Sequence, residues 1–224
     1  MKQLAVVLLS GGLDSCVTAA VARRNFDLAL FYLDYGQRTN ARERRAFLEI
    51  ADYYGVPARH RLAAATDALR RVGGSALTDR NVPVPDADVE RNDVPLTYVP
   101  FRNALFLSLG VSWAESVGAS SVYLGAVEED SSGYPDCTQA FCDAFARAVD
   151  SGTRPESRIR ILTPVIHLRK HQIVRLGVEL GAPLHLTWSC YRNSDRACGR
   201  CDSCILRLKA FETAGIPDPA QRES

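Results

Sequence analysis

Near its beginning the chain reads Leu4-Ala-Val-Val-Leu-Leu-Ser-Gly-Gly-Leu-Asp-Ser15, and this stretch decides which fold to expect. Leu4–Leu9 is a short apolar run rich in β-forming residues, which is typical of a strand buried on both faces. The two glycines that follow allow a tight turn. From Asp14 to Arg24 the apolar residues recur at helical spacing. A buried strand that turns directly into a helix is the first unit of an α/β fold.

The alternation of strand and helix continues along most of the chain. Further strands are expected at Leu28–Leu33, near His60–Ala63, at Ser121–Leu124 and at Ile159–Leu162. Helices are expected at Asn40–Tyr54, Asn103–Ser116, Thr138–Val149, Lys170–Leu180 and Asp202–Ala214. The alternation predicts a doubly wound, mainly parallel sheet of the Rossmann-like type. Ligands bind such sheets beyond the carboxyl ends of the strands, so the site is expected in the loops there.

Two breaks in this pattern divide the chain. Residues 64–100 contain Gly73-Gly74 and several prolines, and they read as an irregular insert that forms a lid or a binding loop. The clustered cysteines and the final helix come after residue 186. We therefore expect an α/β domain over residues 1–185 and a zinc-binding segment with a helix over residues 186–224.

Composition and charge exclude several classes of protein. Apolar residues make up 46% of the 224 residues and charged residues 24%, which is average for a globular chain. The longest apolar run at the start is Leu4–Leu9, far short of the roughly 20 residues of a membrane span. The net charge of +1 gives no global electrostatic field that would attract nucleic acid or an anionic membrane, although it does not exclude a local basic patch. We expect a cytoplasmic protein with no stable nucleic-acid or membrane partner.

The turn at residues 10–15 has the chemistry of a phosphate site. Free N–H groups at the start of the next helix, with the hydroxyls of Ser10 and Ser15, can donate to phosphate oxygens. The turn lacks the Gly-Lys-Ser/Thr ending of a P-loop, so γ-phosphate transfer is not indicated. A turn that merely links strand to helix is the plain alternative. The order Ser-Gly-Gly-x-Asp-Ser resembles the signature of the PP-loop ATP pyrophosphatases. That resemblance implies an adenine nucleotide alpha hydrolase-like fold, transfer of AMP to a substrate oxygen, and Mg²⁺ at Asp14.

Four of the seven cysteines lie close together near the carboxyl end, at Cys190, Cys198, Cys201 and Cys204. They supply the four thiolates that a structural zinc ion prefers, with no open position for a substrate. A [4Fe–4S] cluster is a rival because it also takes four cysteines, and a redox pair would need only two of them. We predict one structural zinc ion per chain. Cys16 and Cys142 fall at helix positions and are expected to be small core residues.

Motifs in the other loops narrow the resemblance. They are Asp34-Tyr-Gly-Gln-Arg38, Val82-Pro-Val-Pro-Asp86, Tyr98-Val-Pro-Phe-Arg-Asn103, Ser132-Gly-Tyr-Pro-Asp-Cys137 and Thr187-Trp-Ser-Cys-Tyr191. With the PP-loop and the cysteines, they resemble the 7-cyano-7-deazaguanine synthases, the QueC family of the queuosine pathway, over nearly the whole chain. Three places depart from the commonest version, one of them the acidic stretch Glu128-Glu-Asp130. Phe101 stands where glycine is frequent, and Thr138 stands where arginine is frequent.

The resemblance implies an ATP-dependent ligase that converts 7-carboxy-7-deazaguanine and ammonia to 7-cyano-7-deazaguanine through adenylated intermediates. It also implies a homodimer. The nucleotide pocket is expected to include Leu9, Ser10, Gly11, Gly12, Leu13, Asp14, Ser15, Asp34, Gln37 and Gly125.

Other side chains are candidates for catalysis and for binding the second substrate. Beside Asp14, Arg102 and Lys170 could neutralise the phosphates, because positioned cations stabilise such transition states. A solvated helix start is the alternative for Lys170. The guanine-like edge of the substrate carries adjacent N–H donors that suit a carboxylate. The candidate substrate residues are therefore Arg102, Asn103, Glu128, Tyr134 and Asp136.

Two other kinds of function stay open from the sequence. One is a different PP-loop adenylating enzyme that acts on a deazapurine acid or on a tRNA base. The low net charge and the gathering of cysteines into one cluster weaken the tRNA thiolating version of this idea. The other is a non-catalytic binding module organised by zinc, which would leave residues 10–15 unexplained and would turn over no ATP.

Overall fold

The centre of the molecule is a sheet of five parallel strands. The computed structural model describes residues 2–88, 93–128 and 133–221. The strands are β1 (Leu4–Leu8), β2 (Asp27–Asp34), β3 (Arg61–Ala65), β4 (Ser121–Leu124) and β5 (Arg160–Leu162). Their order is β3-β2-β1-β4-β5, and each neighbouring pair is parallel. The predicted doubly wound parallel sheet is confirmed, and its order reverses between β1 and β4.

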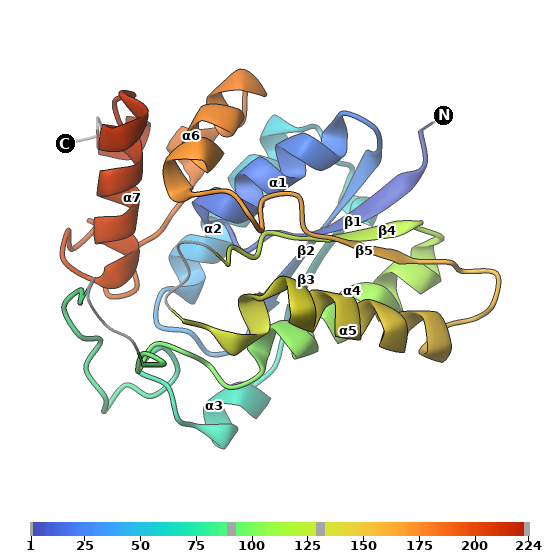
Figure 1. Ribbon diagram of the computed structural model, residues 1–224, viewed down its shortest axis with the longest axis horizontal. Helices are drawn as coiled ribbons and strands as arrows, with labels where there is room; N and C mark the ends of the chain where they lie inside the picture. The colour runs from blue at the N-terminus through green and yellow to red at the C-terminus, as the bar shows by residue number, and fades with distance from the viewer. Residues whose placement is uncertain (1, 89–92, 129–132, 222–224) are drawn as a thin grey trace.

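Helices cover both faces of this sheet (Figure 1). One face carries α4 (Arg102–Val117) and α5 (Gln139–Gly152), and the other carries α1 (Leu13–Arg23) and α2 (Asn40–Tyr53). Val6 and Leu8 of β1 pack toward α4, while Val7 packs toward α1 and α2. Successive side chains of a strand point to opposite faces, so a strand covered on both sides is apolar at every position. This explains the unbroken apolar run that opens the sequence.

The carboxyl-terminal helices extend the helical layer beyond α1. α6 (Lys170–Glu179) and α7 (Asp202–Ala214) lie against each other, and α6 also contacts α1. Val17 of α1, Ile173 of α6 and Phe211 of α7 meet in one buried apolar cluster. This cluster places the cysteine segment, which directly precedes α7, on the same side of the molecule as the start of α1.

The insert at residues 64–100 is mostly irregular, as predicted, but it contains a short helix that we did not predict, α3 (Ala68–Val72). Arg38 fixes part of the insert, because its guanidinium donates to the carbonyl oxygens of Ala76, Asp79 and Val82 at 2.6–2.7 Å. Apolar side chains of the insert also join the cysteine segment in one buried cluster. The insert therefore packs against the cysteine segment.

The other predicted elements are confirmed with small shifts at their ends. The structure adds four short 3₁₀ turns at Ala58–His60, Pro135–Cys137, Leu184–Leu186 and Pro219–Gln221. Cys16 and Cys142 are buried in α1 and α5, as predicted. Among the helices of the described residues, none combines the length and apolar character needed to span a membrane. The division of the chain near residue 185 stays a prediction.

Candidate functional site

A cavity of about 230 Å³ lies at the carboxyl ends of β1 and β4, where the strand order reverses. This is where ligands bind open α/β sheets. Most of the predicted site residues line it: Leu9, Ser10, Gly12, Leu13, Asp14, Ser15, Gln37, Arg102, Asn103, Gly125, Tyr134 and Lys170. The other predicted residues, Gly11, Asp34, Glu128 and Asp136, lie outside its lining. The structure therefore gathers the PP-loop and both predicted cations around one cavity.

Two glycines let the PP-loop pack tightly against its surroundings. Gly11 has a φ of +83°, and a Cβ atom there would lie 2.7 Å from the carbonyl oxygen of Glu43. A Cβ atom on Gly125 would lie 2.9 Å from the backbone nitrogen of Ser15. Both positions therefore exclude any side chain. The loop's own hydroxyls are close as well, with Ser10 Oγ 3.1 Å from Ser15 Oγ.

The start of α1 is arranged to receive an anion. Gly12 is the N-cap residue, and no side chain caps the helix there. The N–H groups of the first turn are therefore available to a ligand, aided by the helix dipole. Ser15 Oγ donates to the carbonyl oxygen of Gly12 at 3.0 Å, which holds the turn in shape.

Asp14 forms an ion pair with Lys170 across the edge of the cavity. Lys170 Nζ lies 2.5 Å from Asp14 Oδ2, and both side chains are largely buried. The second oxygen, Asp14 Oδ1, is buried and has no hydrogen-bond partner. A buried carboxylate oxygen without a donor fits a cation ligand, since carboxylates are the usual ligands of Mg²⁺. The predicted roles of both residues thus have a geometric basis.

Arg102 reaches the cavity from the first residue of α4. Its guanidinium donates to the hydroxyl of Tyr35 at 3.1 Å and lies 5.6 Å from the ring centres of Tyr35 and Phe106. Its Nε is buried without a partner, and among the described residues it forms no ion pair. A desolvated guanidinium with spare donors is a strong site for an anionic ligand.

The beginning of α4 is held by the segment before α5. Asp136 accepts the backbone N–H of Asn103 at 2.8 Å, and the Asn103 amide donates to the Asp136 carbonyl oxygen and to Cys137 Sγ. One carboxylate oxygen of Asp136 is thus used to cap α4. Burial raises the pKa of Cys137 to about 11, so this cavity thiol is protonated at neutral pH and is a weak nucleophile. These contacts hold the start of α4, and with it Arg102, while the predicted roles of Asn103 and Asp136 in substrate binding stay predictions.

The remaining predicted residues have partners that explain their positions. Asp34 accepts from the Gly36 backbone and the Asn40 amide, and it lines a separate cavity beyond β2. Glu128 accepts the backbone N–H of Gln139 at 3.2 Å. Tyr134 does line the central cavity and donates to Thr97. Their expected roles in binding stay predictions. Glu129 and Asp130, next to Glu128, lie outside the described residues.

Glu43 is a cavity residue that the sequence analysis missed. It lies on α2, and its carboxylate accepts from the hydroxyl of Thr39 at 2.7 Å and from the amide of Gln37 at 2.9 Å. Burial raises the pKa of this carboxyl above its ordinary value, against the opposing effects of those two hydrogen bonds. In the sequence it belongs to the charged run Arg42-Glu-Arg-Arg45, which is typical of a solvated helix face, so nothing there marked it.

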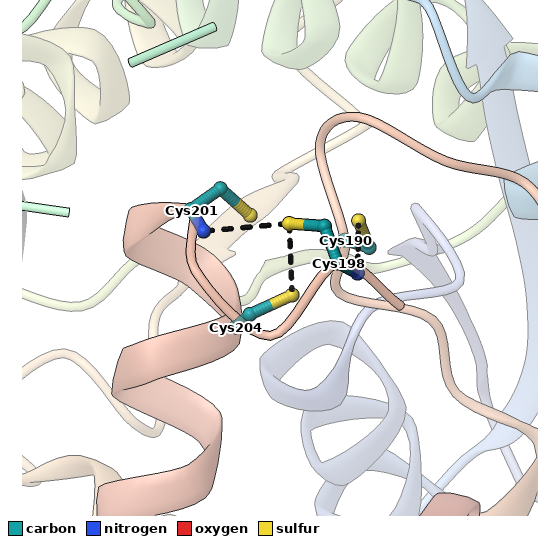
Figure 2. A group of neighbouring side chains, drawn as sticks. All are labelled: Cys190, Cys198, Cys201 and Cys204. Atoms are coloured by element: carbon teal, nitrogen blue, oxygen red, sulfur yellow. Dashed lines mark hydrogen bonds between the residues drawn. The ribbon is translucent and has the colours of Figure 1, made fainter. Parts of the chain in front are cut away.

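The four predicted metal ligands converge on one point (Figure 2). Their sulfur atoms all lie within 4.8 Å of one another, and Cys198 Sγ lies 3.9 Å from Cys204 Sγ. Four sulfurs about 2.3 Å from a tetrahedral zinc ion would be about 3.8 Å apart, whereas an iron–sulfur cluster spreads them over separate iron atoms. The spacing thus fits a single tetrahedral ion. Backbone N–H groups of Arg192, Asn193 and Cys198 donate to Cys190 Sγ at 3.3–3.4 Å, as expected around a thiolate ligand.

The cysteine segment also touches the PP-loop. The backbone N–H of Trp188 donates to the carbonyl oxygen of Gly11 at 2.9 Å, only two residues before Cys190. Arg42 of α2 lies over the Trp188 ring, with its guanidinium carbon 4.9 Å from the ring centre. The segment that a metal ion would order is therefore the same one that supports the turn at residues 10–15.

Comparison with known proteins agrees with this architecture. The family model for "Queuosine biosynthesis protein QueC" matches residues 4–215. The chain is 56% identical over 220 residues to the 7-cyano-7-deazaguanine synthase of Chlorobium luteolum, with 98% of this chain and 96% of that protein covered. It is 52% identical over 221 residues to the synthase of Chlorobium chlorochromatii, with the same coverage. For that of Acidobacterium capsulatum the identity is 53% over 222 residues, covering 97% and 96%.

Proposed function

Because the chain belongs to the QueC family of queuosine biosynthesis proteins, we propose that it makes 7-cyano-7-deazaguanine from 7-carboxy-7-deazaguanine, ammonia and ATP. The chain is an enzyme of the family whose relatives are named 7-cyano-7-deazaguanine synthase. Its reaction joins nitrogen to a carboxyl carbon. A carboxylate resists attack by ammonia because its oxygen is a poor leaving group, and transfer of AMP to that oxygen removes the obstacle.

One observation carries the proposal most directly: an uncapped helix start, an Asp–Lys ion pair and a buried arginine face the same cavity. The N–H groups of the PP-loop would hold the phosphates of ATP at the start of α1. Lys170 and Arg102 would balance the negative charge that develops when pyrophosphate leaves. The acid then receives AMP within reach of the same cations.

The same cavity would serve two rounds of activation. In the first, ammonia attacks the adenylated acid and displaces AMP, which leaves the amide. In the second, AMP is transferred to the amide oxygen, and loss of AMP and the two nitrogen-bound protons gives the nitrile. Each round removes one oxygen atom from this carbon, and that oxygen leaves as part of AMP. Walls formed by Tyr35, Phe106 and Trp188 would keep water away from the adenylated intermediates.

Two metal ions fit the side chains present. The unpartnered Oδ1 of Asp14 would bind Mg²⁺, which supplies positive charge to the phosphates of ATP. The four cysteines would bind one zinc ion, and because all four positions are then filled, that ion is structural. Zinc binding of this kind can contribute on the order of 10 kcal/mol to folding.

We further propose that the enzyme works in the cytoplasm as a homodimer and forms no stable complex with nucleic acid. A reducing compartment keeps the thiols of a four-cysteine site available for metal. The dimer follows from the resemblance to the family.

The proposal is tested by incubating the zinc-loaded protein with ATP, Mg²⁺, an ammonium salt and 7-carboxy-7-deazaguanine. We expect the nitrile and AMP to accumulate together, as followed by mass spectrometry. AMP formed with another acid or with tRNA, but not with this one, would identify a different adenylating enzyme. If no acid gave AMP, the result would favour the alternative, a non-catalytic binding module organised by a metal ion.

A further inference from the structure

Five charged side chains line the central cavity: Asp14, Glu43, Arg102, Lys170 and Arg207. Three of them are neutralised by ion pairs. Asp14 pairs with Lys170 at 2.5 Å, and Arg207 of α7 pairs with Asp218 at 2.7 Å. Within residues 2–88, 93–128 and 133–221, Glu43 and Arg102 form no ion pair. The cavity therefore presents one carboxyl group and one guanidinium that no ion pair among the described residues occupies.

The carboxylate of Glu43 is held in a fixed orientation. Oε1 accepts from the Thr39 hydroxyl and Oε2 from the Gln37 amide. Gln37 is itself buried and fixed, because its amide also donates to the Tyr32 hydroxyl and its oxygen accepts the Tyr35 backbone N–H. Each carboxylate oxygen has two acceptor positions, so one on each oxygen is left over. The carboxylate of a cavity-lining residue thus keeps an acceptor position on each of its two oxygens.

The proposed substrate has the complementary pattern. One end of a guanine-like ring carries two adjacent donors, the ring N–H and the exocyclic amino group. The other end carries the carboxylate that reacts. The two oxygens of one carboxylate match the first end, and a guanidinium without an ion pair among the described residues matches the second. Arg102 also acts electrostatically on Glu43, so both charges belong to the same region of the cavity.

We propose that Glu43 accepts the two donors at the guanine-like end of the substrate and so determines which base the enzyme takes. This inference rests on the proposed function and deepens it. Glu43 lines the cavity, whereas the two carboxylates predicted for that role do not: Asp136 caps α4 and Glu128 accepts from Gln139, and their roles in substrate binding stay predictions. Burial disfavours the charged carboxylate of Glu43, and two further hydrogen bonds from a bound substrate would add to the partial compensation that Thr39 and Gln37 supply.

The test compares two acids: 7-carboxy-7-deazaguanine and the analogue that lacks the exocyclic amino group. Their dissociation constants are measured by calorimetry with the zinc-loaded protein, and kcat/KM is measured with ATP and ammonium. The wild type is expected to favour the guanine-like acid by about 10- to 100-fold, the worth of a hydrogen bond to a charged group. In Glu43→Gln the preference should fall to within about threefold, while the affinity for ATP stays within about twofold.

The control is Glu179→Gln, which makes the same change of charge on an exposed residue at the end of α6. It should keep the full preference. Glu43→Gln keeps one acceptor oxygen for the Gln37 amide and presents a donor that the rotatable Thr39 hydroxyl can accept, so the variant is expected to fold, which its melting curve would show. Full preference retained in Glu43→Gln would overturn the inference and leave the function standing. No turnover of either acid by the wild type would overturn both.

Discussion

At the scale of single side chains, Asp14 does two things at once. One of its oxygens holds Lys170, and the other is buried without a partner at the start of α1. This division lets one carboxylate orient a cation of the protein and still bind a second cation that arrives with the nucleotide.

Asp14→Asn is therefore expected to remove AMP formation and to leave the fold intact. An amide has one oxygen instead of two and no negative charge, so the variant cannot serve both cations. We expect AMP release to fall by about 100-fold or more, with zinc unchanged at one per chain. A kinetic assay and metal analysis of the same sample measure both.

The matched control for this variant is Asp27→Asn, which makes the same change at an exposed residue at the opposite end of the sheet. It should keep normal activity. Turnover by Asp14→Asn close to that of the wild type would refute the role of Asp14.

Single residues were predictable from the sequence where a local pattern carries the chemistry. The spacing of the four cysteines predicted that their sulfur atoms would converge, and the resemblance of residues 10–15 to the PP-loop signature pointed to Ser10 and Asp14. Glu43 is different. It becomes a cavity residue only because Gly11 lets α2 pack within van der Waals distance of the PP-loop, a contact between separate segments that no local pattern records.

At the scale of elements, the start of α4 is the most constrained junction near the site. Phe101, the residue before α4, has a φ of +55° and a side chain that is 64% exposed. Positive φ costs a residue with a Cβ atom about 1 kcal/mol or more. The ring contacts Phe141 edge-on and otherwise faces solvent. The junction thus holds Arg102 in place at a cost in backbone energy.

Phe101→Gly is expected to stabilise the protein by about 1 kcal/mol, since glycine adopts positive φ without that cost. The corresponding rise in melting temperature is about 2–4 °C. Phe101→Ala keeps the Cβ atom and loses the same ring, so it separates the backbone effect from the ring contact. Equal melting temperatures for the glycine and alanine variants would show that the left-handed backbone is not strained.

Most elements could be predicted because their apolar spacing matches the faces that they bury. The helix α3 and the exact extent of β3 could not, since both depend on neighbours far along the chain. The backbone of β3 pairs with that of β2, and its own side chains are mostly half-exposed, which leaves a weak pattern. The insert after α3 is held by hydrogen bonds from Arg38, and no local pattern links Arg38 to residues about 40 positions further along the chain.

At the scale of the whole molecule, the cysteine segment and the PP-loop form one connected unit. The hydrogen bond from Trp188 to Gly11 joins them, and α7 continues from Cys201 into the cluster that contains α1 and α6. A metal ion held by the four cysteines would therefore influence the nucleotide site by ordering the chain that supports it.

Cys201→Ser should consequently lower both zinc content and ATP affinity. Loss of one of four thiolates opens the site, and disorder of residues 186–204 would release the support of Gly11. We expect zinc well below one per chain and an ATP dissociation constant at least about fivefold higher, by metal analysis and calorimetry. Cys142→Ala, in α5 and outside the cluster, should change neither quantity. Normal ATP binding by a zinc-free Cys201→Ser protein would show that the two sites are independent.

The most direct test of the account follows the oxygen atoms of the acid. The substrate is 7-carboxy-7-deazaguanine labelled with ¹⁸O in both carboxylate positions. It is converted with ATP and ammonium, and the masses of AMP and pyrophosphate are measured by mass spectrometry. If the PP-loop cavity adenylates first the acid and then the amide, each AMP molecule carries one ¹⁸O atom and pyrophosphate carries none. Label found in pyrophosphate or in water, with unlabelled AMP, would contradict transfer of AMP to the substrate.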